Sequence, residues 1–279
     1  MEKTVEKLTE QEIIQKIANR ECFVATSEDN AFTIKIDKYV PVMSAAIHNG
    51  GQFREELKDN CLLSQEERYY EEDPHTGSFI EEQAITLIGN DSRYEYDLNR
   101  NTQECVYETA WGKEIWKKPQ TEETIAFSKG KHARFYRIVA AIVEALREDF
   151  GECVVYDNHS YNYRRHERQD LPVINIGTSS VKSEKWRPVI DSFITRLRGM
   201  NVPSLDITVA ENDIFYGKGY LAQFCHERYD NVLVLATESK KVFMNELTGQ
   251  AEADILPTYK AEYNKAIADH SKRYINANH

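Results

Sequence analysis

Long apolar runs are missing from this chain of 279 residues. No stretch approaches the ~18 consecutive apolar residues that a membrane-spanning helix needs, so we expect no membrane partner. Residues 1–6 are polar and acidic and lack the apolar core of a secretion signal. The five cysteines are scattered without a Cys-x-x-Cys pair, a pattern typical of reduced thiols. These absences together predict a cytoplasmic protein.

An excess of positive charge is missing too. Aspartate and glutamate number 46 against 35 lysines and arginines, which gives a net charge of −11. Nucleic-acid binding depends on cationic surfaces, so the composition argues against a nucleic-acid partner. A small anionic substrate remains compatible with it, because the local charge of a pocket can oppose that of the whole protein. The sequence leaves the oligomeric state open.

Internal repeats and low-complexity linkers are absent, so we expect one domain over residues 1–279. Apolar strand-like runs alternate with helical patterns, which predicts an α/β three-layer sandwich around a mainly parallel or mixed central sheet. The expected strands are 31–36, 42–47, 93–97, 153–156, 173–176, 206–209 and 232–236. The expected helices are 9–20, 64–72, 78–89, 130–149, 186–198 and 257–274, the first and last of them packed on the domain.

Two histidines stand where expected strands end. His48 follows the apolar run 42–47 and precedes a turn through Gly50 and Gly51, while His159 follows the run that begins at Val154. In α/β proteins the carboxyl ends of strands line the crevice that binds ligands. Two imidazoles at such ends suit a zinc site. Taken alone, a histidine at such a position more often has a structural role.

Candidate partners for a carboxylate substrate follow the expected strand 93–97. Asn99 and Arg100 place an amide beside a planar guanidinium, which matches a carboxylate in a bidentate way. Arg93 precedes them and is a candidate to polarise a carbonyl. The alternative is that these arginines pair with surface acids. Glu238 closes the apolar run 232–236 and is either a general base with a raised pKa or an exposed strand-end acid.

The order His…Arg-Tyr-x-x-Asp-Leu-Asn-Arg…Asp-x-His-Ser…Glu resembles the N-formylglutamate amidohydrolase family, over roughly residues 40–250. Residues 72–76 and 212–219 are similar to further segments of that family. The string 93–100 is the most specific part, and it is also similar to the aspartoacylase and succinylglutamate desuccinylase group. Those relatives share the zinc-carboxypeptidase fold, so the resemblance implies a zinc-carboxypeptidase-like fold here.

The resemblance also implies a metal and a chemistry. It implies one Zn²⁺ per chain with His48 and His159 as ligands, and it implies that Glu238 activates the attacking water and then protonates the leaving amine. Zinc lowers the pKa of a bound water to ~7 and polarises a carbonyl. By the same resemblance Asn99 and Arg100 hold the substrate carboxylate. Arg93 would then stabilise the oxyanion, because a preorganised cation stabilises the negative charge that develops there.

The second metal ligand departs from the pattern of the relatives. Zinc carboxypeptidases and aspartoacylases take it from a glutamate three residues after the first histidine, and Gly51 occupies that position here. We expect Glu72 or Asp73 to supply the ligand instead, because this acidic pair lies in the matching segment ahead of a proline. The sequence does not decide between the two.

A polar, basic run that includes Arg164 and Arg165 lies just beyond His159. It is either a solvated loop or the rim of a pocket that strengthens a preference for anionic substrates. The leading hypothesis is zinc-dependent hydrolysis of an N-acylated acidic amino acid, such as N-formyl-L-glutamate to formate and glutamate. A carboxypeptidase-like hydrolase of short peptides and a non-catalytic carboxylate-binding protein of this fold are the alternatives.

Overall fold

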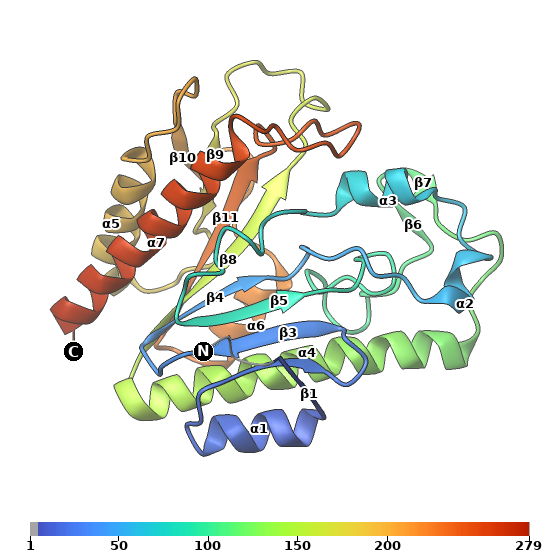
Figure 1. The fold of residues 1–279 in the computed structure, drawn as a ribbon, viewed down its shortest axis with the longest axis horizontal. Coiled ribbons are helices and arrows are strands. Elements are labelled where there is room, and N and C mark those ends of the chain that lie inside the picture. The colour runs from blue at the N-terminus through green and yellow to red at the C-terminus, as the bar shows by residue number, and fades with distance from the viewer. Residues whose placement is uncertain (1–4, 279) are drawn as a thin grey trace.

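A mixed sheet of nine strands forms the centre of the protein (Figure 1). The computed structural model describes residues 5–278. The strands run in the order β1-β2-β3-β5-β4-β8-β11-β9-β10. Their bounds are β1 Glu6–Leu8, β2 Phe23–Ser27, β3 Phe32–Ile36, β4 Val42–Ala46, β5 Ile85–Gly89, β8 Cys153–Tyr161, β9 Ile174–Gly177, β10 Val209–Glu211 and β11 Val232–Lys240. A separate two-stranded sheet pairs β6 (Thr109–Ala110) with β7 (Lys113–Glu114).

Helices cover both faces of the large sheet and complete the three layers (Figure 1). One apolar core joins α1, α4 and α6 to one face of the sheet, and a second core joins α5 and α7 to the other. The expected three-layer α/β sandwich is therefore confirmed. The helices are α1 Glu10–Ala18, α2 Glu55–Lys58, α3 Gln65–Glu71, α4 Glu122–Phe150, α5 Arg187–Arg198, α6 Tyr220–Arg228 and α7 Leu256–Asn278, with a 3₁₀ turn at Glu184–Trp186.

The four central strands β5, β4, β8 and β11 are parallel to one another. The residues of β4 and β8 are all buried, as expected of strands with a layer on each face. Because these strands are parallel, their carboxyl ends meet at one edge of the sheet. Antiparallel pairing of β2 with β3, β3 with β5 and β9 with β11 makes the sheet mixed.

Both ends of the described chain belong to this sandwich. Thr9 caps α1 through its side chain, as its position before the helical pattern predicts, and Ile13 and Ile17 enter the same core as α4. In α7, Tyr259 and Ile267 are buried in the opposite core. This packing supports the proposal that residues 1–279 form one domain.

Two of the expected elements are wrong, and the strand expected at 206–209 shares only one residue with the observed β10 (Val209–Glu211). Residues 78–84 form turns and β5 follows them, where the sequence suggested one helix over 78–89. The run from Ile85 to Ile88 pairs with β3 and β4, and this pairing overrides the helical pattern. Residues 93–97 form turns instead of a strand. Their polar side chains make contacts of their own, such as Tyr96 with Asp91 and Arg93 with Asp97.

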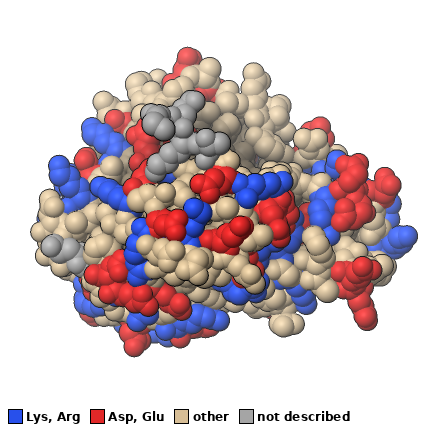
Figure 2. Space-filling view, turned by 60° about the horizontal axis from the view of Figure 1, so that its bottom comes forward, with Lys and Arg blue, Asp and Glu red and all other residues tan. Residues whose placement is uncertain are grey.

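The face formed by α1 and α4 carries acidic and basic side chains in alternation (Figure 2). Arg137 of α4 pairs there with Glu10 of α1, and Arg20, two residues after α1, pairs with Asp149 of α4 at 2.7 Å. Such exposed pairs contribute little stability each, about 0–1 kcal/mol. Among residues 5–278, every helix is too short or too polar to span a bilayer.

Candidate metal centre and the cleft around it

Two buried imidazoles lie side by side at the carboxyl edge of the sheet. His48 comes two residues after β4, and His159 lies on the neighbouring parallel strand β8. Their ring centres are 5.3 Å apart with planes at 66°, and their side chains are only 2% and 4% exposed. The structure therefore brings together the two histidines that the sequence placed at separate strand ends.

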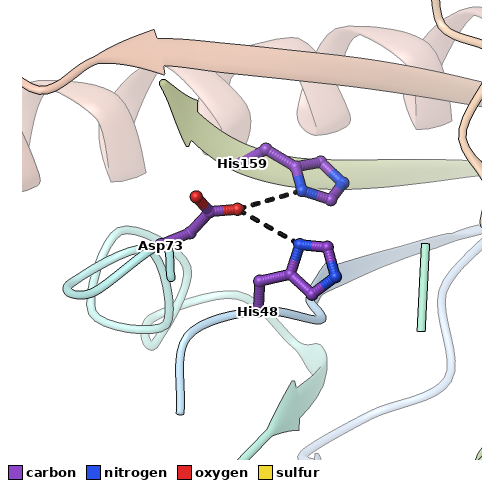
Figure 3. Close-up of side chains that lie close together, drawn as sticks. All are labelled: His48, Asp73 and His159. Atoms are coloured by element: carbon purple, nitrogen blue, oxygen red, sulfur yellow. Dashed lines mark hydrogen bonds and ion pairs between the residues drawn. The ribbon is translucent and has the colours of Figure 1, made fainter. Parts of the chain in front are cut away.

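The carboxylate of Asp73 faces both rings (Figure 3). One oxygen, Oδ2, lies 3.4 Å from His48 Nδ1 and 3.2 Å from His159 Nδ1. The ligand-type atoms of these three residues all lie within 4.8 Å of one another. The two Nδ1 atoms and one Asp73 oxygen therefore face a common point.

Asp73 is held from several sides. Its backbone N–H donates to His48 O at 2.9 Å, and its second carboxylate oxygen accepts a hydrogen bond from Ser160 Oγ at 3.3 Å. Lys241, just after β11, donates from Nζ to the carbonyl of Glu72 at 2.7 Å. Because Glu72 directly precedes Asp73, this bond fixes the backbone that carries the carboxylate.

The outer nitrogens of the two imidazoles are each held by a carboxylate. His48 Nε2 hydrogen bonds to Asp97 Oδ1 at 2.7 Å, and His159 Nε2 lies 2.9 Å from Asp157 Oδ1 in an ion-pair contact. With Nε2 held in this way, Nδ1 of each ring is directed at Asp73. Histidines that bind metals are commonly oriented by such a carboxylate.

The pKa shifts follow from these contacts. Burial would raise the pKa of Asp73, but His159 and His48 outweigh it and hold this pKa well below its usual range. Burial would lower the pKa of His159, but Asp157 and Asp73 outweigh it and raise this pKa. Burial raises the pKa of Glu238 to about 8; His159 opposes the rise, and Asp73 and Asp157 add to it. Negative charge is thus concentrated around two imidazoles, which suits a divalent cation.

Glu72 is buried nearby, with 3% exposure, but its side chain takes a different direction. A Cβ built on Gly51 would lie 2.7 Å from Glu72 Oε2, so the carboxylate fills the space beside this glycine. Within the described residues, the metal-type cluster comprises His48, Asp73 and His159 without Glu72. Of the two acids that the sequence left open, the geometry favours Asp73.

A cleft with two lobes opens over this cluster. The first, here called the arginine lobe, has a volume of about 340 Å³ and is lined by residues that include His48, Asp73, Arg93, Trp111 and Arg165. The second, here called the glycine lobe, has a volume of about 320 Å³ and is lined by residues that include Asp157, Tyr216, Gly217, Lys218 and Ala236. Four residues line both lobes: Asn99, His159, Phe215 and Glu238.

Several predicted substrate residues reach this cleft. Arg93 donates to Glu71 O at 2.9 Å and to Asp97 Oδ2 at 3.0 Å, and its Nε is buried without a hydrogen-bond partner. Asn99 accepts the Tyr220 N–H through Oδ1 at 3.1 Å. Arg165 pairs with Glu71 at 2.7 Å on the rim of the arginine lobe.

Two predicted arginines lie elsewhere. The Arg100 side chain is 48% exposed, with Nε 3.6 Å from Asp97 Oδ2 and its guanidinium over the ring of Tyr107. The Arg164 side chain is also 48% exposed and lies beside Glu246. Neither is among the described residues that line the two lobes. Their roles in substrate binding stay predictions without a contact to support them.

The profile of a protein family described as N-formylglutamate amidohydrolase matches residues 40–244, most of the chain. The chain belongs to this family. The crystal structure of N-formylglutamate amidohydrolase from Ralstonia eutropha JMP134 is similar with a TM-score of 0.75 and 16% identity, covering 88% of this chain and 98% of that chain. The gene product Atu2144 from Agrobacterium tumefaciens is similar with a TM-score of 0.62 and 18% identity, covering 86% and 95%.

At these identities the two structures establish a shared fold. A metallo-carboxypeptidase from Burkholderia cenocepacia gives a weaker likeness, with a TM-score of 0.45 and 13% identity over 87% of this chain and 61% of that chain. No curated protein matches the sequence. The resemblance that the motifs indicated is thereby confirmed for the family and for its α/β fold.

The sequence analysis missed three residues that support the candidate metal centre. Asp157 precedes His159 by two residues on one strand. Side chains two residues apart on a strand lie on the same face, so the spacing could have indicated that Asp157 lies beside His159. Asp97 lies within the motif 93–100, but its contact with His48 arises only in the folded loop. Lys241 follows β11 without any local signal.

Proposed function

We propose that this protein is a zinc-dependent amidohydrolase that cleaves the amide of an N-acylated acidic amino acid, with N-formyl-L-glutamate as the type substrate. The observation that carries the proposal is the convergence of His48, Asp73 and His159 in the same cleft as Glu238. Membership of the N-formylglutamate amidohydrolase family supports the class of reaction.

The donor set fits zinc. His48 Nδ1 is buried without a hydrogen-bond partner, and it converges with His159 Nδ1 and an Asp73 oxygen. Zinc prefers four ligands of nitrogen and oxygen type, and catalytic sites use three from the protein and leave one position open. When bound, zinc would supply Lewis acidity toward the scissile carbonyl and the attacking water.

Glu238 is positioned to move the protons. It lies on β11 directly opposite His159 of β8 in the parallel register, and it lines both lobes. Its raised pKa of about 8 makes this carboxylate a better proton acceptor than an exposed glutamate. We infer that it accepts a proton from the attacking water and passes it to the leaving nitrogen.

The remaining groups of the cleft would bind and polarise the substrate. Arg93 lies in the arginine lobe close to His48 and Asp73, where its fixed charge would stabilise negative charge developing on the carbonyl oxygen. Arg165 and Asn99 are the groups of this cleft best suited to a substrate carboxylate, because they offer a guanidinium and an amide.

The direct test is to measure metal content and formate release from N-formyl-L-glutamate together, using protein purified without chelator. We expect about one zinc per chain and hydrolysis that chelator abolishes. Glu238→Gln should keep the zinc and lower the rate by roughly 10²–10⁴-fold. Glu227→Gln, an exposed glutamate on α6, is the matched control and should behave like wild type.

Failure would take two distinct forms. Protein that takes up no zinc even when zinc is offered would rule out the metal hydrolase. Protein that holds zinc but hydrolyses no N-acyl amino acid would support the non-catalytic carboxylate-binding alternative. Hydrolysis of short peptides is a second candidate activity, favoured by a cleft that continues on both sides of Glu238, and a dipeptide belongs in the same assay.

A further inference from the structure

The two lobes of the cleft meet at the reacting groups. Asn99, His159, Phe215 and Glu238 line both lobes, so these residues form a waist between them. A scissile amide placed at the waist would have the arginine lobe on one side and the glycine lobe on the other. The two substituents of the amide would then extend in different directions.

The size of each lobe is large for a formyl group. The lobes measure about 340 Å³ and 320 Å³, and each is at the lower end of the ~300–1,000 Å³ of small-molecule pockets. A formyl group has two heavy atoms and takes up about as much room as two water molecules, roughly 60 Å³. Formyl would leave most of either lobe filled with water.

The linings of the two lobes suit organic groups on both sides. Besides the waist, the glycine lobe presents Ile214, Tyr216 and Ala236. Its cation is Lys218, whose Nζ lies 5.9 Å over the Tyr216 ring and forms no ion pair within the described residues. The arginine lobe presents the indole of Trp111 together with Arg165. Each lobe therefore combines apolar surface with cationic side chains: Lys218 in the glycine lobe, and Arg93 and the Glu71-paired Arg165 in the arginine lobe.

We propose that the preferred substrates carry a group of several heavy atoms on each side of the scissile amide, so that the acyl group is larger than formyl. This inference rests on the proposed hydrolase function and narrows its substrates to N-acyl amino acids whose acyl group is larger than formyl. In the reaction the carbon–nitrogen bond breaks, the water oxygen bonds to the acyl carbon, and the water's protons end on the leaving amine and on solvent. Water is the only co-reactant required.

A substrate series tests the inference. The zinc-loaded protein is assayed with N-formyl-, N-acetyl- and N-benzoyl-L-glutamate, with product release followed by mass spectrometry. We expect kcat/KM to rise by roughly tenfold or more from formyl to benzoyl, because one side of the cleft is filled only by the larger group. A kcat/KM for the formyl compound equal to or above the others would overturn the inference and leave the hydrolase function intact.

A binding measurement tests the proposed substrate class separately from the proposed hydrolase function. Calorimetric titration of the zinc-loaded Glu238→Gln protein with the same series measures affinity without turnover. Tighter binding of the benzoyl compound than of the formyl compound would support the substrate class even if wild type hydrolysed none of them. Equal or weaker binding would overturn it.

Variants of the glycine lobe locate the effect. Ala236→Leu should narrow the lobe. The preference for a large group on the side of the amide that occupies this lobe, acyl or amino acid, should then fall by roughly tenfold. Tyr216→Ala, at an exposed rim position, should reduce the same selectivity without disturbing the fold. Leu247→Ala lies outside both lobes and is the control. Unchanged selectivity in both lobe variants would contradict occupation of this lobe by substrate.

Discussion

His48 and His159 present the same atom to Asp73, yet the chain supports them in different ways. His159 and its carboxylate partner Asp157 lie two residues apart on one strand. His48 is held by Asp97, which lies 49 residues further along the chain. One half of the candidate site is therefore built by local strand geometry, and the other half depends on the folding of a distant loop.

The loop that carries Asp97 is supported by buried charge. Burial would raise the pKa of Asp97, but Arg93 and His48 outweigh it and hold this pKa well below its usual range. Further out, Lys131 of α4 lies 2.7 Å from Asp91 and 2.8 Å from Glu95. The loop that supports His48 is thus held by two groups of buried ion pairs, one of which reaches α4, and breaking such buried pairs is costly.

The largest expected effect comes from the residue that both halves share. Asp73→Asn should weaken zinc binding by more than about 100-fold, which exceeds the usual loss for an outer partner of a ligand. Glu72→Gln is the matched control and should weaken binding by less than about tenfold, because its side chain points toward Gly51. Titration with a fluorescent zinc chelator measures both. The reverse order would assign the second ligand to Glu72.

The next effect separates the two histidines. Asp97→Asn should weaken zinc binding by about 100-fold and Asp157→Asn by about tenfold, within the range seen for outer partners of ligating histidines. The difference follows because Asp97 also receives hydrogen bonds from Arg93 and from the Asn99 N–H. Equal losses in the two variants would show that the local and the distant support are equivalent.

A smaller effect is expected at the backbone that carries Asp73. Lys241→Met removes the hydrogen bonds from Nζ to the carbonyls of Tyr70 and Glu72. Each such bond contributes about 1 kcal/mol, so zinc binding should weaken by up to about tenfold. Lys240→Met, at the neighbouring position, should leave binding unchanged. Loss of thermal stability without any change in zinc affinity would contradict a positioning role for Lys241.

The smallest effect contrasts the site histidines with a core histidine. Burial lowers the pKa of His270 to about 4, and its ring is held by the Tyr156 hydroxyl and the Val189 carbonyl. Between pH 7.5 and 5.5 the unfolded His270 takes up a proton that the folded one does not, so stability falls as pH falls. Wild type should lose about 1 kcal/mol more than His270→Gln over this window. Urea unfolding at the two pH values measures the difference, and equal losses would argue against a neutral buried ring.

Much of the fold could be predicted from the sequence, because buried parallel strands read as apolar runs. The apolar runs before His48, His159 and Glu238 marked three strands, although β8 and β11 continue two residues beyond His159 and Glu238. Parallel pairing brought the three residues together. The family that the motif 93–100 resembles was confirmed by the profile match over residues 40–244. The helix expected over residues 78–89 failed because pairing with neighbouring strands outweighed a local pattern.

Side-chain directions in loops could not be predicted. Asp73 and Glu72 are adjacent, and only the turn after α3 decides which of them faces the histidines. Arg100 ends the motif 93–100 and Arg164 lies in the basic run beyond His159, yet neither side chain lines the cleft. Such segments lack the regular periodicity of helices and strands, so spacing alone carries no information about where a loop side chain points.

A crystal structure of the zinc-loaded protein, with anomalous data collected at the zinc edge, tests the central claim most directly. We predict one strong anomalous peak at about 2.0–2.2 Å from Nδ1 of His48, Nδ1 of His159 and a carboxylate oxygen of Asp73. A peak bound through the Nε2 atoms, or one lying away from these three residues, would contradict the account.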